Sequence, residues 1–289
     1  MSIRLTDSHF DTLFKKGYVI VHRFLPEAQC TEMAAAVRRL LPPWDDIKDD
    51  AQGTRKDACY FPYPEQCLNH AIINAEAINF ARRWLETEHI HYRPGLALVR
   101  YPGFQGGLDK GHIDNGNNSL LPPTESDHTH SQLNFWFYLE DVAADQAPTL
   151  FIINGDHYDL RKAEAMVAPA GSVCIFHNYT QHAASDYTRG EGQRYIWKFA
   201  FGRSDHYWEG TAHYTQVGSN AHFRKFIGAL SAVDRELFRF PPAGHAYYTR
   251  QTLAALEEQY PGWNLHNEYA PLSQQKIPVR ETRIKPFTS

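Results

Sequence analysis

Two runs in the middle of the chain decide the fold class: Gly171-Ser-Val-Cys-Ile-Phe-His177 and Arg194-Tyr-Ile-Trp-Lys-Phe-Ala-Phe201. Both runs are rich in β-branched and aromatic residues, which predicts strands rather than helices. The turn residues Gly190-Glu-Gly192 separate them, so we expect the second strand to lie beside the first. A sheet of short neighbouring strands is therefore predicted at the centre of the protein.

Strands of the same texture are predicted on the N-terminal side of these runs. Clusters of Gly, Pro and Asn or Asp separate them, and they cover residues 89–92, 95–101, 132–139 and 149–154. No helical pattern lies between the strands. We therefore expect an antiparallel sandwich or barrel rather than a parallel sheet.

Helical spacing flanks this β region on both sides. The predicted helices cover residues 5–16, 27–41, 72–86, 223–237 and 253–259, and one further strand is predicted at 18–25. The fold class is therefore mainly β with flanking helices.

We expect one domain over residues 1–289, because the composition shows no shift, repeat or low-complexity tract. Within it we expect a helical N-terminal region at 1–88 and a β core with the chemistry at 89–202. A C-terminal cover of helices and loops is expected at 203–289.

Composition excludes several kinds of partner. The formal net charge of −4 gives no basic footprint, so nucleic acid is not expected as a partner. No run of about 18 apolar residues indicates a membrane role, and the N-terminus has no signal-peptide pattern, so we expect a cytoplasmic protein. The four cysteines form no metal-binding or disulfide pattern and are expected to be free thiols without a catalytic role.

A candidate metal site follows the strand predicted at 95–101. His112 and Asp114 are two residues apart, and in an extended chain such side chains point to the same side. The pair alone is common by chance, so a third ligand has to come from elsewhere. Two histidines and one carboxylate with open positions are the arrangement of non-haem iron oxygenases.

His182 is the candidate third ligand, because it follows the strand predicted over 172–177 after a short loop. His177 is its rival, five residues earlier, and the register of the next strand favours His182. His128 and His130 lie in a polar loop before a strand, where either is a candidate for reaching the substrate.

Arg194 opens the strand after His182, twelve residues later. A guanidinium fork binds a carboxylate through two parallel hydrogen bonds. This suits 2-oxoglutarate, which would chelate the metal at one end and pair with Arg194 at the other. Arg189 is the rival arginine, and its position before Gly190 indicates a surface charge in a turn.

These segments resemble the phytanoyl-CoA dioxygenase family of iron(II)- and 2-oxoglutarate-dependent oxygenases. The resemblance runs in order through residues 17–25, His112-x-Asp114, 137–142, 147–157, 170–182 and Arg194. It implies a double-stranded β-helix, the cupin-like jelly roll. It also implies iron held by His112, Asp114 and His182, and 2-oxoglutarate held by Arg194.

The chain departs from the family pattern at three points. Asn154-Gly155-Asp156-His157 replaces the usual Pro-Gly-Ser-His loop, and Ala184 stands where a small hydroxylated residue is common. The spacing from His182 to Arg194 is one residue longer than usual. These departures bear on secondary contacts to the cosubstrate rather than on the metal.

The strand over 132–139 alternates between two sets of side chains, and one set lines the barrel. If that set contains Asn134 and Trp136, then Asn134 hydrogen-bonds 2-oxoglutarate and Trp136 borders the pocket. Ordinary packing of both sets is the alternative.

The resulting hypothesis is an iron(II)/2-oxoglutarate-dependent dioxygenase that uses O2. It hydroxylates an unactivated C–H bond of a small-molecule metabolite and releases succinate and CO2. The carboxylate of Asp114 argues against halogenation, because halogenating relatives carry a small residue at that position. The alternatives are a cupin-type metal-dependent isomerase or hydrolase and a non-catalytic jelly-roll binding protein, and neither requires Arg194.

Overall fold

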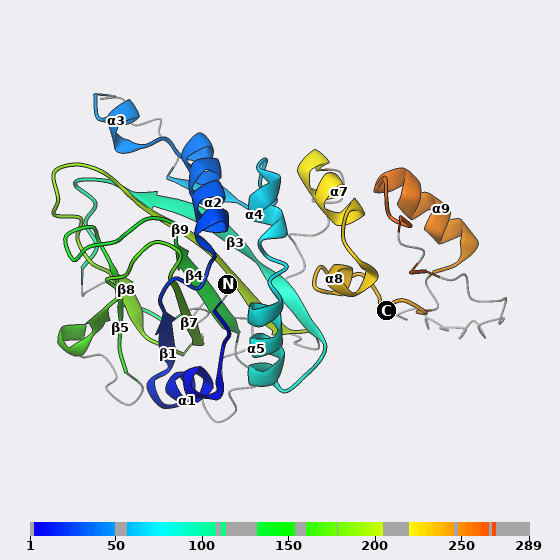
Figure 1. The fold of residues 1–289 in the computed structure, drawn as a ribbon, viewed down its shortest axis with the longest axis horizontal. Helices are drawn as coiled ribbons and strands as arrows, with labels where there is room; N and C mark the ends of the chain where they lie inside the picture. Colours follow the sequence, from blue (N-terminus) through cyan, green and yellow to red (C-terminus); the bar gives the residue numbers. More distant parts are fainter. Residues whose placement is uncertain are drawn as a thin grey trace, which may run out of the picture.

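The computed structural model describes residues 3–49, 57–107, 111–113, 132–153, 160–177, 179–204, 220–245, 248–265 and 268–269 (Figure 1). None of the helices in these segments combines the length and apolar character that a membrane crossing needs.

A six-stranded antiparallel sheet forms the centre of the molecule, in the order β1-β7-β4-β9-β3-β2 (Figure 1). Its strands are β1 (Tyr18–Val21), β2 (Ala58–Tyr60), β3 (Ile90–Arg100), β4 (Leu133–Tyr138), β7 (Val173–His177) and β9 (Arg194–Arg203). A smaller antiparallel sheet has the order β6-β5-β8. Its strands are β5 (Thr149–Phe151), β6 (Glu164–Ala165) and β8 (His182–Ala184), and a short 3₁₀ helix covers Leu160–Lys162.

From β4 onward the chain passes repeatedly between the two sheets. Strands β4, β7 and β9 belong to the large sheet, and β5, β6 and β8 belong to the small one. This alternation of strands between two facing antiparallel sheets is the jelly roll, so the predicted fold class is confirmed.

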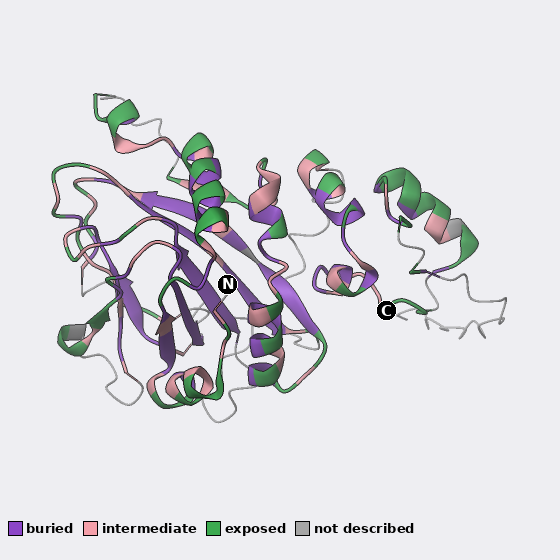
Figure 2. Ribbon diagram, in the orientation of Figure 1, coloured by how far each residue is buried: buried purple, intermediate pink, exposed green. Residues whose placement is uncertain are grey.

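The large sheet has two faces of different character. We call the face turned toward the helices the helix face; its buried side chains include Phe135, Phe137, Trp197 and Phe199. The opposite face, the inner face, carries the second apolar cluster, which includes Trp136, Tyr138, Cys174, Phe176 and Ile196. Figure 2 shows these strands as buried, while the outer sides of the helices are exposed.

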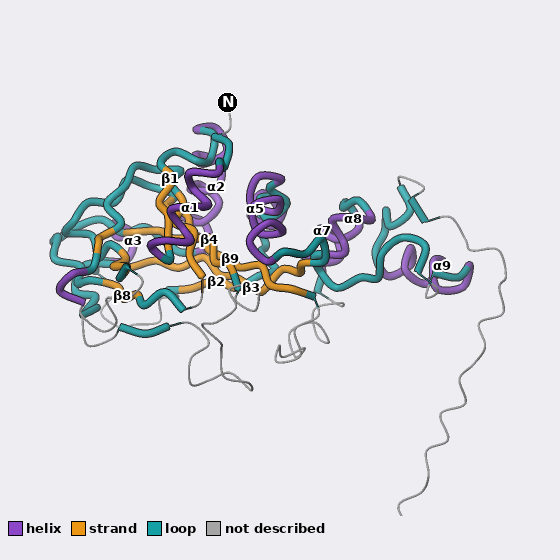
Figure 3. The backbone as a smooth tube through the Cα atoms, turned by 90° about the horizontal axis from the view of Figure 1, so that it is seen from below, coloured by secondary structure: helices purple, strands orange, loops and turns teal. Residues whose placement is uncertain are grey.

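The helix face is covered by α1 (Asp7–Lys16), α2 (Glu27–Leu40) and α5 (Ala75–Leu85). Figure 3 shows α1, α2 and α5 on one side of the strands. The predicted apolar stripe of α2 is buried, with Met33 and Val37 fully inaccessible. Helix α1 ends at Gly17 with φ +85°, which a residue without Cβ adopts at little cost. Two further helices are short, α3 (Trp44–Ile47) and α4 (Gln66–His70).

The C-terminal part contains α7 (Ala221–Gly228), α8 (Ala232–Glu236) and α9 (Arg250–Gln259). The single helix predicted over 223–237 was wrong. Ser231 interrupts it, because its side chain accepts a hydrogen bond from the Asp234 amide and caps a new helix.

An aromatic cluster attaches these helices to the rest of the protein. The Phe61 ring stacks on Phe238 at 5.8 Å and meets Phe223 and Phe226 edge-on at about 6 Å. Phe61 therefore packs in the main core, not over a ligand site.

Several strand predictions need correction. Strands β7 and β9 are not neighbours as expected, because β4 lies between them and pairs with both. Residues 89–92 and 95–101 form one strand, β3, because Pro94-Gly95 makes a bulge and does not end the pairing. A Cβ on Gly95 would overlap the Lys198 carbonyl oxygen, so only glycine fits there. Strand β1 ends at Val21, since the chain turns at Arg23 with φ +52°. Strand β5 ends at Phe151, shorter than predicted.

Candidate functional site

His182 lies at the start of β8 between two neighbours. It pairs with Phe151 of β5 on one edge and with His112 on the other. The backbone of His112 and His182 exchanges two hydrogen bonds, of 3.0 and 2.9 Å. This bridge holds two histidines that are 70 positions apart in the chain side by side.

The two imidazole rings lie close enough together to bind the same ion. Their ring centroids are 4.5 Å apart with an interplanar angle of 50°. Two imidazoles that bind one ion through Nε2 at about 2.1 Å, at right angles, would place their centroids about 4.5 Å apart. The observed pair therefore fits a metal ion of this kind.

The tautomer of His182 is also set for metal binding. Its Nδ1 lies 3.0 Å from the Thr180 carbonyl oxygen, which only a protonated Nδ1 can approach as a donor. Thr180 is in turn tied to the Gly17 carbonyl through its hydroxyl, at 2.5 Å. Because Nδ1 carries the proton, the Nε2 lone pair is available to a metal.

The third predicted ligand, Asp114, lies outside the described residues. Within the described segments no group of three His, Cys, Asp or Glu side chains is placed to hold a metal. His128, His130 and His157 also lie outside the described residues.

The structure separates His177 from His182. His177 lies on the helix face, where its ring stacks on Trp84 with centroids 5.8 Å apart and an interplanar angle of 10°. His91 is buried, and its Nε2 lies 3.1 Å from the Arg239 Nη2. Neither ring lies beside His182, which is surrounded by the inner face instead.

Aromatic rings of the inner face surround His182. Trp136 meets it edge-on at 5.2 Å, and Phe176 lies 5.0 Å away. The Lys198 ammonium lies 4.0 Å above the centre of the Trp136 ring, so a cation is held beside the histidine pair. Asn134 is on the same face, paired with Phe176 on β7 and Ala200 on β9.

Arg194 starts β9 on the inner face and is 2% exposed. It donates one hydrogen bond to the Ala147 carbonyl oxygen, and its Nε has no partner. No carboxylate of the described residues pairs with it. Burial lowers the pKa of Arg194 from its usual value, and the neighbouring Arg100 adds to this effect while Tyr138 opposes it. A buried cation of this kind is costly unless an anion pairs with it.

Arg189, the rival, has a partner on the surface. Its guanidinium binds Asp145 through two hydrogen bonds, of 3.1 and 2.8 Å. The mutual pairing lowers the pKa of Asp145 from its usual value. Arg189 therefore pairs with Asp145 at the surface and does not take part in the inner face.

The sequence profile of the phytanoyl-CoA dioxygenase (PhyH) family matches residues 14–194, well over half of the chain. The chain belongs to this family. The match begins in α1 and ends at Arg194, so it includes His112, His182 and the strands that place them.

Several solved structures are similar in fold to this chain. SnoK, a non-haem α-ketoglutarate-dependent carbocyclase from nogalamycin biosynthesis, is 18% identical with a TM-score of 0.51, over 70% of this chain and 85% of SnoK. HygX from Streptomyces hygroscopicus, crystallised with nickel and 2-oxoglutarate, is 11% identical with a TM-score of 0.54, over 71% and 90%. EvdO2 from Micromonospora carbonacea var. aurantiaca is 14% identical with a TM-score of 0.55, over 70% and 94%. These likenesses show the fold.

One curated relative also matches in part. A release factor glutamine methyltransferase of Streptomyces coelicolor is 29% identical over 119 residues, which is 39% of this chain. The chain spans 38% of that protein's length. A match of this extent assigns no activity to this family member.

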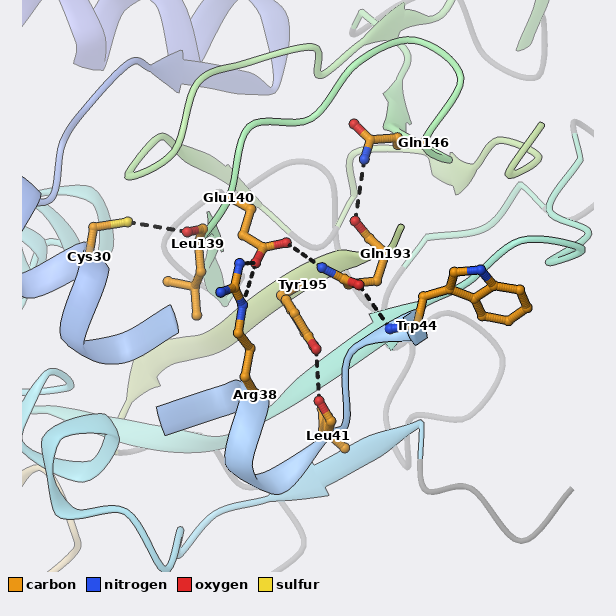
Figure 4. A network of polar contacts seen from close by, with 9 residues as sticks. All are labelled: Cys30, Arg38, Leu41, Trp44, Leu139, Glu140, Gln146, Gln193 and Tyr195. Atoms are coloured by element: carbon orange, nitrogen blue, oxygen red, sulfur yellow. Dashed lines mark hydrogen bonds and ion pairs between the residues drawn. The ribbon is translucent and has the colours of Figure 1, made fainter. Parts of the chain in front are cut away.

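A network of polar side chains holds the start of β9 in place (Figure 4). The Gln193 side chain accepts from the Trp44 amide at 3.0 Å and donates to Glu140 at 3.1 Å. Glu140 in turn accepts from Arg38 at 2.8 Å. The network therefore joins α2 and α3 to the residue directly before Arg194.

Sequence reasoning missed the backbone acceptor of Arg194. Ala147 is fully buried and has φ +52°, an unusual value for a residue with a Cβ. This conformation presents its carbonyl oxygen to the guanidinium. Gln146 reinforces the contact, since its side chain donates to the Gln193 carbonyl oxygen at 3.3 Å. A backbone carbonyl group has no sequence signature.

Proposed function

We propose that this chain is an iron(II)- and 2-oxoglutarate-dependent dioxygenase that hydroxylates an unactivated C–H bond of a small-molecule metabolite. Its family and fold support the oxygenase class. Hydroxylation is the finer part of the proposal, and it rests on Asp114, because halogenating relatives carry a small residue at that position of the sequence.

One observation carries the proposal: Arg194 is a fully buried cation with no carboxylate partner in the described part of the chain. An unpaired charge in that position is destabilising by several kcal/mol on the order-of-magnitude scale of buried ions. A ligand carboxylate removes this cost, and the planar guanidinium suits its two oxygens. The distal carboxylate of 2-oxoglutarate is such a group.

The metal ligands in this proposal are His112, His182 and Asp114. Bound iron(II), with 2-oxoglutarate and O2, supplies the oxidising power, and the cosubstrate leaves as succinate and CO2. The protein's own contribution is to hold and orient the groups. Thr180 keeps the His182 ring in one tautomer, and Arg194 holds the distal carboxylate.

The surrounding residues make the site dry and asymmetric. Trp136 and Phe176 are 9% and 0% exposed and exclude water from one side of His182. A low local dielectric strengthens each polar contact to a bound carboxylate. Asn134 lies beside these rings and is proposed to donate a hydrogen bond to the cosubstrate.

The experiment is a coupled assay of cosubstrate turnover and product. Anaerobically iron-loaded protein is given O2, 2-oxoglutarate and a panel of candidate metabolites, and succinate is quantified against oxygenated product by mass spectrometry. The proposal predicts one succinate per product and a mass increase of one oxygen. A loss of two hydrogens, or a ring closure like that of a carbocyclase, would replace hydroxylation with another oxidative outcome.

The alternatives make different predictions for the same protein. A cupin-type isomerase or hydrolase would work with zinc or manganese and would not bind 2-oxoglutarate. A non-catalytic binding protein would release no succinate with any substrate. Metal analysis together with a 2-oxoglutarate titration separates both from the dioxygenase.

A further inference from the structure

We propose that Arg93 and Gln132 are positioning residues that orient the side-chain amide of Asn134, so that its Nδ2 donates to the metal-end carboxylate of 2-oxoglutarate. This inference rests on the proposed function and assigns to that site two residues that the sequence did not suggest.

Asn134 has the properties of a ligand-binding donor. It is 5% exposed, and its Nδ2 has no hydrogen-bond partner. A buried donor without an acceptor costs about 1–3 kcal/mol. Phe176, its neighbour across β4 and β7, lies 5.0 Å from the His182 ring. The missing acceptor is therefore expected beside the histidine pair.

Arg93 fixes the direction of the amide groups. Its Nη1 donates to the Gln132 Oε1 at 2.6 Å. A guanidinium has donors only, so this bond obliges Gln132 to turn its oxygen toward Arg93 and its Nε2 away. The Gln132 Nε2 then donates to the Asn134 Oδ1 at 3.3 Å. With Oδ1 used in this way, Asn134 is left to offer its Nδ2 to the ligand.

The backbone makes room for this arrangement, which we call the Arg93–Gln132–Asn134 relay. Arg93 is buried, and it lies over Gly202 of β9, where a Cβ would come within 2.5 Å of the guanidinium Nε and Nη2. The β3 bulge follows directly after Arg93. Glycine at 202 and the bulge both allow the arginine to lie along the sheet.

Asn134 and Arg194 lie far apart along the inner face. Asn134 pairs with Ala200, six residues after Arg194, which is about 20 Å along a strand. The two side chains therefore cannot share one carboxylate. Arg194 binds the distal carboxylate of 2-oxoglutarate. Asn134 lies next to the neighbours of His182 and binds the carboxylate at the metal end.

The direction of the hydrogen bonds in the relay gives a sharp test. Gln132→Glu keeps the shape of the side chain but removes its hydrogen-bond donor. A carboxylate at position 132 still accepts from Arg93 but can no longer donate to Asn134. The Asn134 amide must then turn its Nδ2 toward position 132 and its Oδ1 toward the ligand. We expect the affinity for 2-oxoglutarate to fall about tenfold or more, as for one lost charge-assisted hydrogen bond.

Two further variants complete the series. Asn134→Asp replaces the donor directly, so it should lose as much affinity as Gln132→Glu. Arg93→Lys retains a donor to Gln132 and should remain within about threefold of the wild type, while Arg93→Met should lose more than Arg93→Lys. Affinity is measured by calorimetric titration of 2-oxoglutarate into nickel-substituted protein without substrate, with thermal unfolding of each variant alongside.

The outcomes separate the relay from the proposed function. Loss of affinity in Gln132→Glu with an unchanged melting temperature, and rescue in Arg93→Lys, would support the relay. Wild-type affinity in Gln132→Glu and Asn134→Asp would overturn it while leaving the dioxygenase intact. If the wild-type protein itself bound no 2-oxoglutarate, the proposed function would fail and the relay with it.

Discussion

The two faces of β4 differ in what they contribute. On the helix face, Phe135 and Phe137 pack in an aromatic core with Phe199 at 5.4 and 5.7 Å. On the inner face, Trp136 meets the His182 ring edge-on, and Asn134 carries a buried Nδ2 without a hydrogen-bond partner. Because side chains alternate along a strand, one six-residue segment supplies stability on one side and binding on the other.

The comparison teaches that parity along a strand, not residue type, separates structural from functional side chains here. On β7, the His177 ring stacks on Trp84 on the helix face, whereas Phe176, one residue earlier, lies against His182 on the inner face. Each prediction below tests whether the two faces can be disturbed independently.

The largest contrast is expected between the two histidines. His182→Ala removes a proposed ligand and should abolish stoichiometric iron binding, measured by metal analysis after anaerobic loading and desalting. His177→Ala should retain full iron content. It should lower the free energy of unfolding by about 1 kcal/mol, because it loses ring stacking on Trp84. Equal iron loss in both variants would contradict the assignment of faces.

A core truncation on the helix face tests the other half of the comparison. Phe135→Ala removes a fully buried ring and should lower the free energy of unfolding by about 3–5 kcal/mol. Chemical denaturation measures this loss. At a temperature where the variant is folded, its affinity for 2-oxoglutarate should match the wild type. A matching loss of affinity would show that the two faces are coupled.

The polar network before Arg194 should give the smallest effect. Glu140→Gln weakens the contacts to Arg38 and Gln193 and should cost about 1 kcal/mol of stability. It should also weaken 2-oxoglutarate binding a few-fold, because the start of β9 loosens. Glu65→Gln breaks a comparable pair with Arg39, outside the network at the start of β9, and is the control. The claim fails if both variants bind 2-oxoglutarate like the wild type.

Much of the fold followed from local pattern. Most strands of the large sheet were visible because β-branched and aromatic runs alternate with turn residues, and Gly17 marked the end of α1. The short strands β2, β6 and β8 were not predicted. What local pattern could not supply was the break at Ser231 and the continuity of β3 through Pro94-Gly95. Both depend on contacts made elsewhere, a cap in one case and pairing with β9 in the other.

The sequence predicted side chains of the site but not the backbone group that contacts one of them. The structure places His112 beside His182 and buries Arg194, as the sequence suggested, while Asp114 stays a prediction. Which face of β4 is the inner one could not be decided, since both sets of side chains are largely apolar. No local sequence pattern indicates that the Ala147 carbonyl accepts from Arg194. The same holds for the contact between Arg93 and Gln132, which are 39 residues apart.

The most direct test of the central claim is the affinity of the metal-loaded protein for 2-oxoglutarate with Arg194 changed. Calorimetric titrations compare the wild type with Arg194→Met, and with Arg189→Met as a control whose arginine is occupied by Asp145. We predict a loss of about 100-fold in Arg194→Met, equivalent to two charge-assisted hydrogen bonds, with no loss of folding stability, and unchanged affinity in Arg189→Met. Wild-type affinity in Arg194→Met would contradict the account.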